Sequence, residues 1–452
     1  MSCSPVPVAG SFLGPPGVRV LGTYPVRAHQ CVPRVREWVH ERRRMGESTP
    51  DVRETRRMLA KGIVIAGVGE TEQGVLPGRG SFDLLAEATK LTLEDAGVTL
   101  ADVDGMVTAF SFVENTLMHA TTFADYLGMA PGYFASVAVG GATAPLMAVQ
   151  AAMAIDAGLA EVVLCVRGDN TRSGISSSGM IAMAREMSHG AYEAPYGLTT
   201  IGGYGLLAQR YMYEHNVPQE ALAAVVATQS EHAALKWNAM LRDVVTIEDV
   251  MADRWIATPF HAMDCSLVSD GACAFLVTTA TRAKSMKPAP VYIPGIGEGY
   301  SHQYISSAKS VDGVRQGLGR AGRRAMEVAG IGPQDLDVVE IYDSFSFTPL
   351  IALEGFGICG PGEAGDWVME GNAKLGGTLP MNTHGGLIRQ AHLGAMHHIV
   401  EAALQLRGEA DDTARGGGNH QVPDAKLALT NGSGGILAAT SALVLSSDAP
   451  SA

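Results

Sequence analysis

The chain has 452 residues, of which 46% are hydrophobic and 17% charged, and its formal net charge at pH 7 is −13. This composition is typical of a globular protein with at least one large core and argues against a disordered chain. The negative charge argues against nucleic acid or an anionic membrane surface as the main partner. An acidic total still leaves room for a local basic pocket that binds a phosphorylated ligand.

The six cysteines are scattered and form no Cys-x-x-Cys pair. This usage is typical of a protein in a reducing cytosol and not of a disulfide framework or a zinc ribbon. No window contains the roughly 18 apolar residues that a membrane span requires, and the N-terminus lacks the pattern of a secretory signal. We therefore expect a cytoplasmic protein that does not enter the membrane.

The first part of the chain differs from the rest. Residues 1–57 are rich in Pro, Gly and Arg, and only the stretch 35–44 has the pattern of a short helix. Such a segment predicts a poorly ordered N-terminal tail. Regular patterning begins at Met58.

An internal repeat organises the patterned part of the chain. A short apolar run that ends in Gly-x-Gly-Glu occurs in 61–71 and again in 290–300. Each run is followed by a helical segment, at 81–107 and at 314–340, that reaches an Ala-Gly pair, where glycine can adopt the left-handed conformation that ends a helix. The first copy closes with a further predicted strand over 262–280.

The second part of each copy has the order strand, Gly-Gly turn, helix and strand, at 136–168 and again at 381–435. Alternation of this kind predicts mostly parallel sheets covered by helices. We therefore predict an α/β protein of two similar halves, 58–285 and 286–452, with a shared cleft between them. An insertion at about 169–260 is longer than a crossover requires, and we expect it to form a cap over the cleft.

Four motifs in a fixed order resemble the thiolase superfamily and, within it, the lipid-transfer-protein branch of sterol-carrier-type thiolase homologues. They are DCSLVSDGA, IYDSFSFTPL, NTHGGL with a histidine after it, and TNGSGG, and the resemblance covers about residues 60–448. It implies a thiolase-like fold with two duplicated βαβαβαββ halves in five α/β/α/β/α layers, and a homodimer. It also implies an acyl-CoA substrate, with coenzyme A as part of that substrate and no tightly bound cofactor.

The turn at which thiolases carry a nucleophilic cysteine contains no cysteine here. It includes Gly140, Gly141 and Thr143, whereas in the family a helix N-terminus at this turn stabilises a thiolate. The two glycines are expected to allow a close backbone approach to the substrate. Thr143 is the only hydroxyl and has no evident base beside it, so we do not expect a covalent acyl-enzyme.

Tyr342, in IYDSF, stands where thiolases carry an asparagine or a histidine. A tyrosine there resembles the steroid side-chain-cleaving aldolases, in which tyrosines act as acid and base. With an ordinary pKa of about 10, a tyrosine donates a proton readily but is a poor base; the alternative is a tyrosine that only closes a strand end. Tyr300 and His302 form a second candidate pair, with Tyr292 and Tyr304 as rivals.

His392, in QAHLGA, keeps the histidine and the Gly-Ala of the family motif G-H-P-x-G-A but lacks its first glycine and its proline. The resemblance implies that this histidine polarises the thioester carbonyl and stabilises the enolate. Asn382, Gly385 and Gly386 match the family motif N-x-x-G-G, and we predict that they bind substrate.

Two further motifs are not expected to supply chemistry. Ser433 and Gly434, in NGSGG, stand near the second cysteine of thiolases and are predicted to form a glycine-rich wall beside the substrate. His384, His397 and His398 contain no His-x-x-x-His pair, so their spacing predicts no metal site.

Together these residues favour a carbon–carbon lyase, an aldolase that cleaves a β-hydroxyacyl-CoA by a retro-aldol reaction. Tyr342 and Tyr300 would serve as the acid and the base, in an order the sequence leaves open, on a steroid or lipid side chain. Two alternatives stay open: acyl transfer of the acetyl-CoA acetyltransferase type with another nucleophile, and a non-catalytic subunit that binds acyl-CoA. Relatives in this branch often work with a zinc-ribbon/OB-fold protein, so such a partner is also predicted.

Overall fold

The computed structural model describes residues 52–114, 116–176, 178–179, 182–183 and 188–450. The predicted tail therefore lies mostly outside the described residues. Its last residues belong to helix α2 (Val52–Leu59), which packs against α12, α5 and β8. Regular structure thus begins ahead of Met58.

Five strands from the first part of the chain lie side by side in the order β3, β2, β4, β7, β1. Strands β2 (Gly105–Ala109), β3 (Tyr133–Val137) and β4 (Val163–Asn170) are parallel. Strand β7 (Asp270–Thr279) is antiparallel to β4 and to β1 (Ile63–Glu70).

Four strands from the second part repeat this order. They are β8 (Val291–Tyr300), β9 (Val338–Glu340), β10 (Leu427–Gly434) and β11 (Ala439–Ser446), arranged as β8, β11, β10, β9. Met381 forms a parallel bridge to Val339 of β9, at the place that β3 holds in the first group. The two groups meet where β1 and β8 pair over a short antiparallel stretch. The duplication predicted from the Gly-x-Gly-Glu repeat is therefore present in the strand order.

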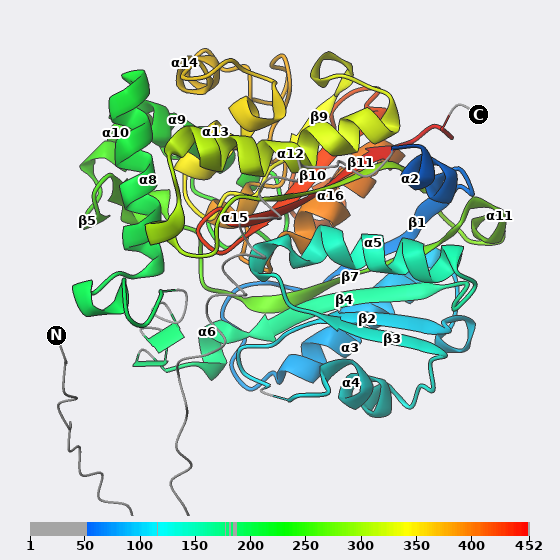
Figure 1. Cartoon of the computed structure of the whole chain (residues 1–452). Helices are drawn as coiled ribbons and strands as arrows, with labels where there is room; N and C mark the ends of the chain where they lie inside the picture. The colour runs from blue at the N-terminus through cyan, green and yellow to red at the C-terminus, as the bar shows by residue number, and fades with distance from the viewer. Residues whose placement is uncertain (1–51, 115, 177, 180–181, 184–187, 451–452) are drawn as a thin grey trace, which may run out of the picture. The chain divides into compact units, whose positions relative to one another are not determined.

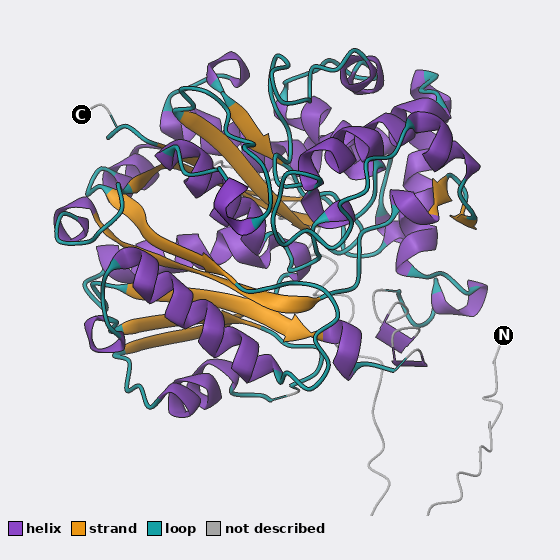
Figure 2. Ribbon diagram, turned by 180° about the vertical axis from the view of Figure 1, so that it is seen from behind, coloured by secondary structure: helices purple, strands orange, loops and turns teal. Residues whose placement is uncertain are grey.

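Helices lie outside and between the two groups of strands. Helix α3 (Ser81–Ala96) covers β1, β4 and β7, and α12 (Val311–Ala329) covers β8 and β11. Helices α5 (Thr143–Asp156) and α16 (Met396–Arg407) contact each other and strands of both groups, so they form a middle layer. Figure 1 shows this succession of layers, and Figure 2 shows from behind the helices that separate the two groups of strands. The five predicted α/β/α/β/α layers are confirmed.

The outer helices end as their sequences predict. Gly97 after α3 and Gly330 after α12 both adopt the left-handed conformation, with φ of 68° and 78°, which a residue without a side chain adopts at little cost. The predicted boundary at 285 falls between α11 and β8. Outside the segment 169–260, the other α-helices of the described residues are α4 (His119–Leu127), α11 (Ala280–Ala283), α13 (Phe347–Phe356), α14 (Ala364–Met369) and α15 (Gly386–Arg389).

The segment predicted as an insertion adds several helices to the C-terminal group of elements. Helix α8 packs on α12, and α9 packs on α14 and α15. The elements of this segment are α6 (Thr171–Gly174), α8 (Thr200–His215), α9 (Gln219–Ala233), α10 (Ile247–Ala252), β5 (Trp255–Ala257) and β6 (Phe260–His261). None of the helices in the described part of the chain has the length and apolar character needed to cross a membrane.

The strand predicted over 262–280 is correct only from Asp270 onward. The segment before it is tied elsewhere, because Asp264 accepts hydrogen bonds from the backbone of His261 at 2.8 Å and from the Ser346 hydroxyl at 2.6 Å. In addition, the Ser266 N–H donates to the Ser344 carbonyl at 3.0 Å. The segment therefore leaves the sheet and lies against the residues that follow β9.

Candidate functional site

A cavity of about 310 Å³ lies where the loops of the two groups of strands meet. Its walls come from the turn before α5, the end of β4, helix α8, the loop before β7, the segment after β9, the loop before α16 and the end of β10. Lining residues with polar groups or close backbone include Gly140, Gly141, Arg167, Asp169, Tyr204, Ser266, Ser269, Tyr342, Ser344, His392 and Ser433. Both repeats and the inserted segment therefore contribute to one site.

Tyr342 and His392 meet in this cavity. The Tyr342 hydroxyl oxygen lies 3.1 Å from His392 Nε2. The other ring nitrogen, Nδ1, lies 3.2 Å from Ser266 Oγ, and the His392 backbone N–H donates to Ser269 Oγ at 2.8 Å. The histidine is thus held by the segment that was predicted to be strand, and its ring is aimed at the tyrosine.

Burial determines the protonation state of this pair. Burial lowers the pKa of His392 to about 4, with a further contribution from Arg167, while a hydrogen bond to the Leu267 backbone opposes the shift. Burial also raises the pKa of Tyr342 well above its ordinary value; Tyr204 adds to this and Arg167 acts against it. At neutral pH the histidine is therefore neutral and the tyrosine protonated. The Tyr342 O–H then donates to Nε2, and the tyrosine oxygen keeps lone pairs that can accept another proton.

The backbone of the Tyr342 segment is fixed by two buried amides. The Tyr342 N–H donates to Asn431 Oδ1 at 3.1 Å. Asn382 accepts from the Ile341 N–H at 2.6 Å and donates to the Ile341 carbonyl at 2.9 Å. Asn382 was predicted to bind substrate, but it is buried and does not line the cavity. Its contacts make it a positioning residue for Tyr342.

The glycines of the turn before α5 make room for the tyrosine. A Cβ atom at Gly141 would lie 2.3 Å from the Tyr342 hydroxyl and 2.3 Å from the Ser433 carbonyl oxygen. Gly140 has a φ of 57°, and a Cβ there would lie 2.9 Å from the Gly434 Cα. Any side chain at position 141 would collide with Tyr342. The turn that lacks the family's cysteine thus leaves the space that Tyr342 occupies.

Arg167 was not singled out from the sequence. It lies near the end of β4, where Nη1 donates to the Gly394 carbonyl at 3.0 Å and the guanidinium sits 5.1 Å from the centre of the Phe110 ring. Among the described residues that line the cavity, it is the only Arg or Lys. The signal available in the sequence was the charged pair Arg167 and Asp169 directly after the apolar run that begins β4.

Tyr204 is a second tyrosine of the cavity that the sequence did not indicate. It belongs to α8, donates its hydroxyl to the Gly435 carbonyl at 2.9 Å, and packs with its ring centre 4.5 Å from that of Phe345. Burial raises its pKa, while Ser344 lowers it by a hydrogen bond. The position of α8 depends on the packing of the inserted segment, so no local motif marks this residue.

Tyr300 and His302 do not line the cavity. Tyr300 is 56% exposed at the end of β8, and His302 is buried with Nδ1 2.8 Å from Ser301 Oγ. The physical reason lies in Ser301, which packs so tightly against α12 that a Cβ at Gly317 would lie 2.4 Å from it. This contact keeps the end of β8 on the outer helix and directs it away from Tyr342.

The other predicted glycines fall into two groups. Gly140 and Gly141 line the cavity together with Ser433, whereas Gly385, Gly386 and Gly434 do not. Gly385 and Gly386 have φ of 98° and 67°, and a Cβ at either would collide with Ala233 or Asp343. They shape the loop behind the cavity, where Asp343 accepts the N–H groups that open α15.

Comparison with known proteins identifies the same architecture elsewhere. The thiolase C-terminal domain-like family matches residues 297–447. Over 364 residues the chain is 35% identical to a steroid side-chain-cleaving aldolase of Thermomonospora curvata, which covers 78% of this chain and 92% of the relative. It is 34% identical over 370 residues to a 17-hydroxy-3-oxo-4-pregnene-20-carboxyl-CoA lyase of Mycobacterium tuberculosis. This match covers 79% of this chain and 95% of the relative. Among solved structures, an Ltp2-ChsH2(DUF35) aldolase superposes with a TM-score of 0.76 at 32% identity, over 86% of this chain and 98% of that chain.

Proposed function

Because this chain belongs to the thiolase superfamily, we propose that it is a carbon–carbon lyase that cleaves a β-hydroxyacyl-CoA by a retro-aldol reaction. The observation that carries the proposal is the Tyr342–His392 pair, which stands beside a turn that holds glycine in place of a nucleophile. The two relatives named above are an aldolase and a CoA lyase. Their chemistry matches what this cavity can perform.

The reaction requires a base for the substrate hydroxyl and an acid for the enolate. As the bond between the α and β carbons breaks, its electron pair passes to the acyl-CoA fragment and the hydroxyl carbon becomes a ketone. Tyr342 accepts the hydroxyl proton while it passes its own proton to His392 Nε2, 3.1 Å away. This relay avoids a free tyrosinate, which burial disfavours. The positive charge of Arg167 stabilises the negative charge that develops near Tyr342.

Tyr204 is the group we propose as the acid that protonates the enolate carbon. It lines the same cavity as Tyr342, and burial keeps its hydroxyl protonated. After the shortened acyl-CoA leaves, solvent restores the Tyr204 proton and takes up the proton held by His392, which returns the pair to its starting state. The catalytic roles predicted for Tyr300 and His302 stay predictions, and the contrast between Tyr204 and Tyr300 is open to direct test.

The wall of the cavity favours a bulky apolar substrate. Apolar side chains face it from several elements, namely Phe110, Phe112, Leu267, Val268, Phe345 and Leu393. We propose a CoA thioester of a steroid or lipid side chain, in keeping with the relatives' substrates. The aldolase of known structure contains a ChsH2(DUF35) component, which supports a partner of that kind for this chain. The homodimer and the cytoplasmic location stay predictions.

Acyl transfer through a cysteine is disfavoured by the state of the thiols. In the described part of the chain, Cys165 and Cys273 are fully buried, and burial raises the pKa of Cys265 and of Cys359 to about 12. A thiol in that state is not a thiolate at neutral pH, and none of the four lines the cavity. The enolate chemistry of the family is therefore favoured over its covalent chemistry.

The test compares two substrates, each with and without a DUF35 partner protein. The first is a tertiary β-hydroxyacyl-CoA, and the second is a 3-oxoacyl-CoA supplied with free coenzyme A. We expect a ketone and a shorter acyl-CoA from the first substrate and no thiolysis of the second. Turnover of the second alone would contradict the proposal in favour of acyl transfer, and turnover of neither with the partner present would contradict it in favour of a binding subunit.

A further inference from the structure

Three histidines meet behind the end of β9. His384 lies in the loop that follows Met381, and His397 and His398 open helix α16. One ring nitrogen from each of the three lies within 4.8 Å of the others. Their exposed fractions are 0%, 1% and 0%. The cluster thus combines one histidine from a loop with two from a helix, and the spacing of residues along a single helix could not reveal it.

Hydrogen bonds within the protein leave part of this cluster without partners. His384 Nε2 lies 2.7 Å from His398 Nδ1, and His384 Nδ1 accepts from the Gly386 N–H at 3.2 Å. Both ring nitrogens of His397 and Nε2 of His398 are buried without a hydrogen-bond partner among the described residues. Because an unpaired buried polar group is costly, three such atoms at one place indicate a ligand.

Two carboxyl groups lie beside the cluster. Glu340 Oε2 lies 3.2 Å from His384 Nε2 and has no hydrogen-bond partner in the described residues, and Asp343 Oδ1 lies 3.6 Å from His398 Nε2. The nearby cation Lys236 is already paired with Glu70 at 2.9 Å and Glu401 at 3.1 Å.

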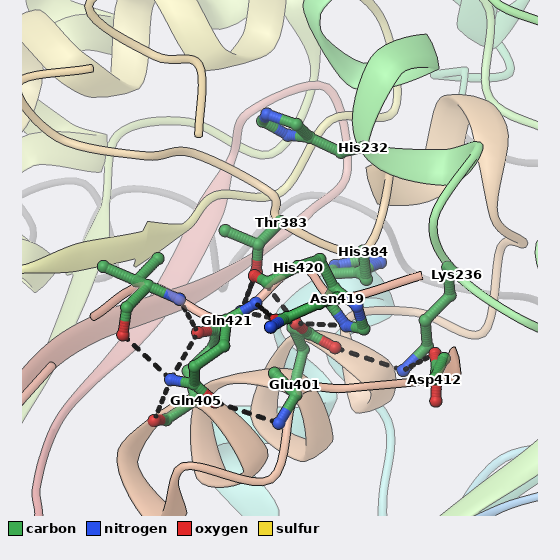
Figure 3. A network of polar contacts seen from close by, with 12 residues as sticks. His232, Lys236, Thr383, His384, Glu401, Gln405, Asp412, Asn419, His420 and Gln421 are labelled. Atoms are coloured by element: carbon green, nitrogen blue, oxygen red, sulfur yellow. Dashed lines mark hydrogen bonds and ion pairs between the residues drawn. The ribbon is translucent and has the colours of Figure 1, made fainter. Parts of the chain in front are cut away.

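The paired lysine belongs to a polar network that reaches the cluster through Thr383, whose Oγ1 lies 2.8 Å from Glu340 Oε1 and 2.8 Å from Glu401 Oε1. Figure 3 shows Lys236 joined to Glu401 within it, and His384 is drawn with the residues of that network. Glu401 also lies 3.2 Å from His420. Among the described residues, the ion-pair partners of Glu340 and Asp343 are histidines of the cluster and not Lys236.

We propose that His384, His397 and His398 together bind one divalent transition-metal ion, with Zn²⁺ as the first candidate. Three imidazoles suit Zn²⁺, Co²⁺, Ni²⁺ or Fe²⁺ and do not suit Mg²⁺ or Ca²⁺. Nitrogens around a tetrahedral Zn²⁺ stand roughly 3.3 Å apart, so the rings of His384 and His398 need to separate only slightly.

The position of the site indicates a structural role next to the reaction. Two ligands lie at the start of α16, which directly follows the loop that holds His392, and the third lies in the loop fixed to Ile341 through Asn382. An ion here would join these segments and so hold Tyr342 against His392. It would not touch the substrate, because none of the three histidines lines the cavity.

Metal content of the purified full-length protein is the first test. After dialysis against metal-free buffer, we expect about one equivalent of Zn²⁺ or another first-row ion per chain by mass spectrometry of the elements. His384→Ala and His397→Leu should each weaken binding by more than about 100-fold. The control is His119→Asn, which changes another buried histidine with an unpartnered Nε2; it should leave metal content unchanged.

A second measurement separates a metal site from a mere cluster of buried rings. Because His397 makes no hydrogen bond among the described residues, its replacement by leucine should raise or preserve the melting temperature if no metal binds. With a bound ion, the same substitution lowers the melting temperature and abolishes the visible absorption of added Co²⁺. Wild-type protein that binds neither Zn²⁺ nor Co²⁺, together with an unchanged or higher melting temperature for His397→Leu, would overturn the proposal.

Discussion

The two repeats hold the same positions in the sheet but contribute different things to the cavity. The first repeat supplies the Phe110 ring after β2, the Arg167 guanidinium near the end of β4, and a glycine turn after β3. At the matching points the second repeat supplies Tyr342 after β9 and Ser433 at β10. The second repeat also carries a long loop with His392, where the first has only a short turn.

The difference shows that two copies of one fold can supply different parts of a single site. The first repeat provides space and a positive charge, the second provides the Tyr342–His392 pair, and the segment inserted in the first half provides Tyr204. Tyr342 crosses to the other repeat, because its hydroxyl fills the volume above Gly141. Neither repeat alone holds a complete site, so substitutions on each side should fail in different ways.

Removing the second tyrosine should have the largest of the following effects. Tyr204→Phe removes the proposed acid and should lower kcat by about 10² to 10⁴-fold, because the enolate must then wait for solvent. Tyr300→Phe is the matched control, since Tyr300 lies outside the cavity, and it should change kcat little. Steady-state rates on a β-hydroxyacyl-CoA decide between the two; a large loss for Tyr300→Phe with a small loss for Tyr204→Phe would reverse our assignment.

Filling the glycine turn should break the fit between the repeats. Gly141→Ala places a methyl group 2.3 Å from the Tyr342 hydroxyl, so the tyrosine must move, with a loss of stability of about 1–3 kcal/mol. We expect kcat to fall more than KM rises, because the displaced tyrosine loses its contact with His392. Gly190→Ala is the control, since nothing lies within 4 Å of a Cβ there. Thermal unfolding and steady-state kinetics of both variants, measured side by side, check this; equal behaviour of the two would contradict it.

Substitution of Arg167 tests what the positive charge supplied by the first repeat contributes to the reaction. Arg167→Met keeps much of the side-chain volume but removes the guanidinium, and we expect kcat to fall by roughly 10 to 100-fold, since one hydrogen-bonding charge is lost near the developing negative charge. A loss confined to KM would instead indicate that Arg167 binds substrate without favouring the reaction. Separate determination of kcat and KM distinguishes these results.

The pH dependence should be the mildest effect. His392 accepts a proton only when neutral, and burial with nearby Arg167 lowers its pKa to about 4. The value of kcat/KM should therefore be flat from pH 7 down to about 5 and fall as the pH drops through 4. The folded pKa lies below the ordinary value, so stability contributed by neutral His392 is also lost as pH falls below about 6.5. An acid limb of kcat/KM near pH 6.5 would argue against His392 as the acceptor.

Sequence patterns predicted the fold better than they predicted the site. The Gly-x-Gly-Glu repeat and the Ala-Gly helix ends are local signals, and both repeats kept them. Tyr342 and His392 lie in motifs that have a fixed place relative to the sheet, so the sequence could indicate both residues that meet in the cavity. Tyr204 was missed because only the packing of an inserted helix brings it to the cavity.

Contacts between distant segments also determine where other predicted residues lie. Tyr300 was expected near Tyr342, but the contact between Ser301 and α12 directs the end of β8 elsewhere. Asn382 has the amide that a substrate could use, yet Ile341 occupies both of its polar atoms. The His-x-x-x-His spacing rule could not detect the cluster of His384, His397 and His398, because a loop supplies one of the three histidines.

The central claim is that Tyr342 carries the proton transfer that starts carbon–carbon cleavage. The most direct test measures ketone release from a β-hydroxyacyl-CoA by wild-type protein and by Tyr342→Phe, each with its partner protein. The account predicts that Tyr342→Phe folds with an unchanged melting temperature, binds the substrate, and releases ketone about 10² to 10⁴-fold more slowly. Ketone release at the wild-type rate by a correctly folded Tyr342→Phe would contradict the account.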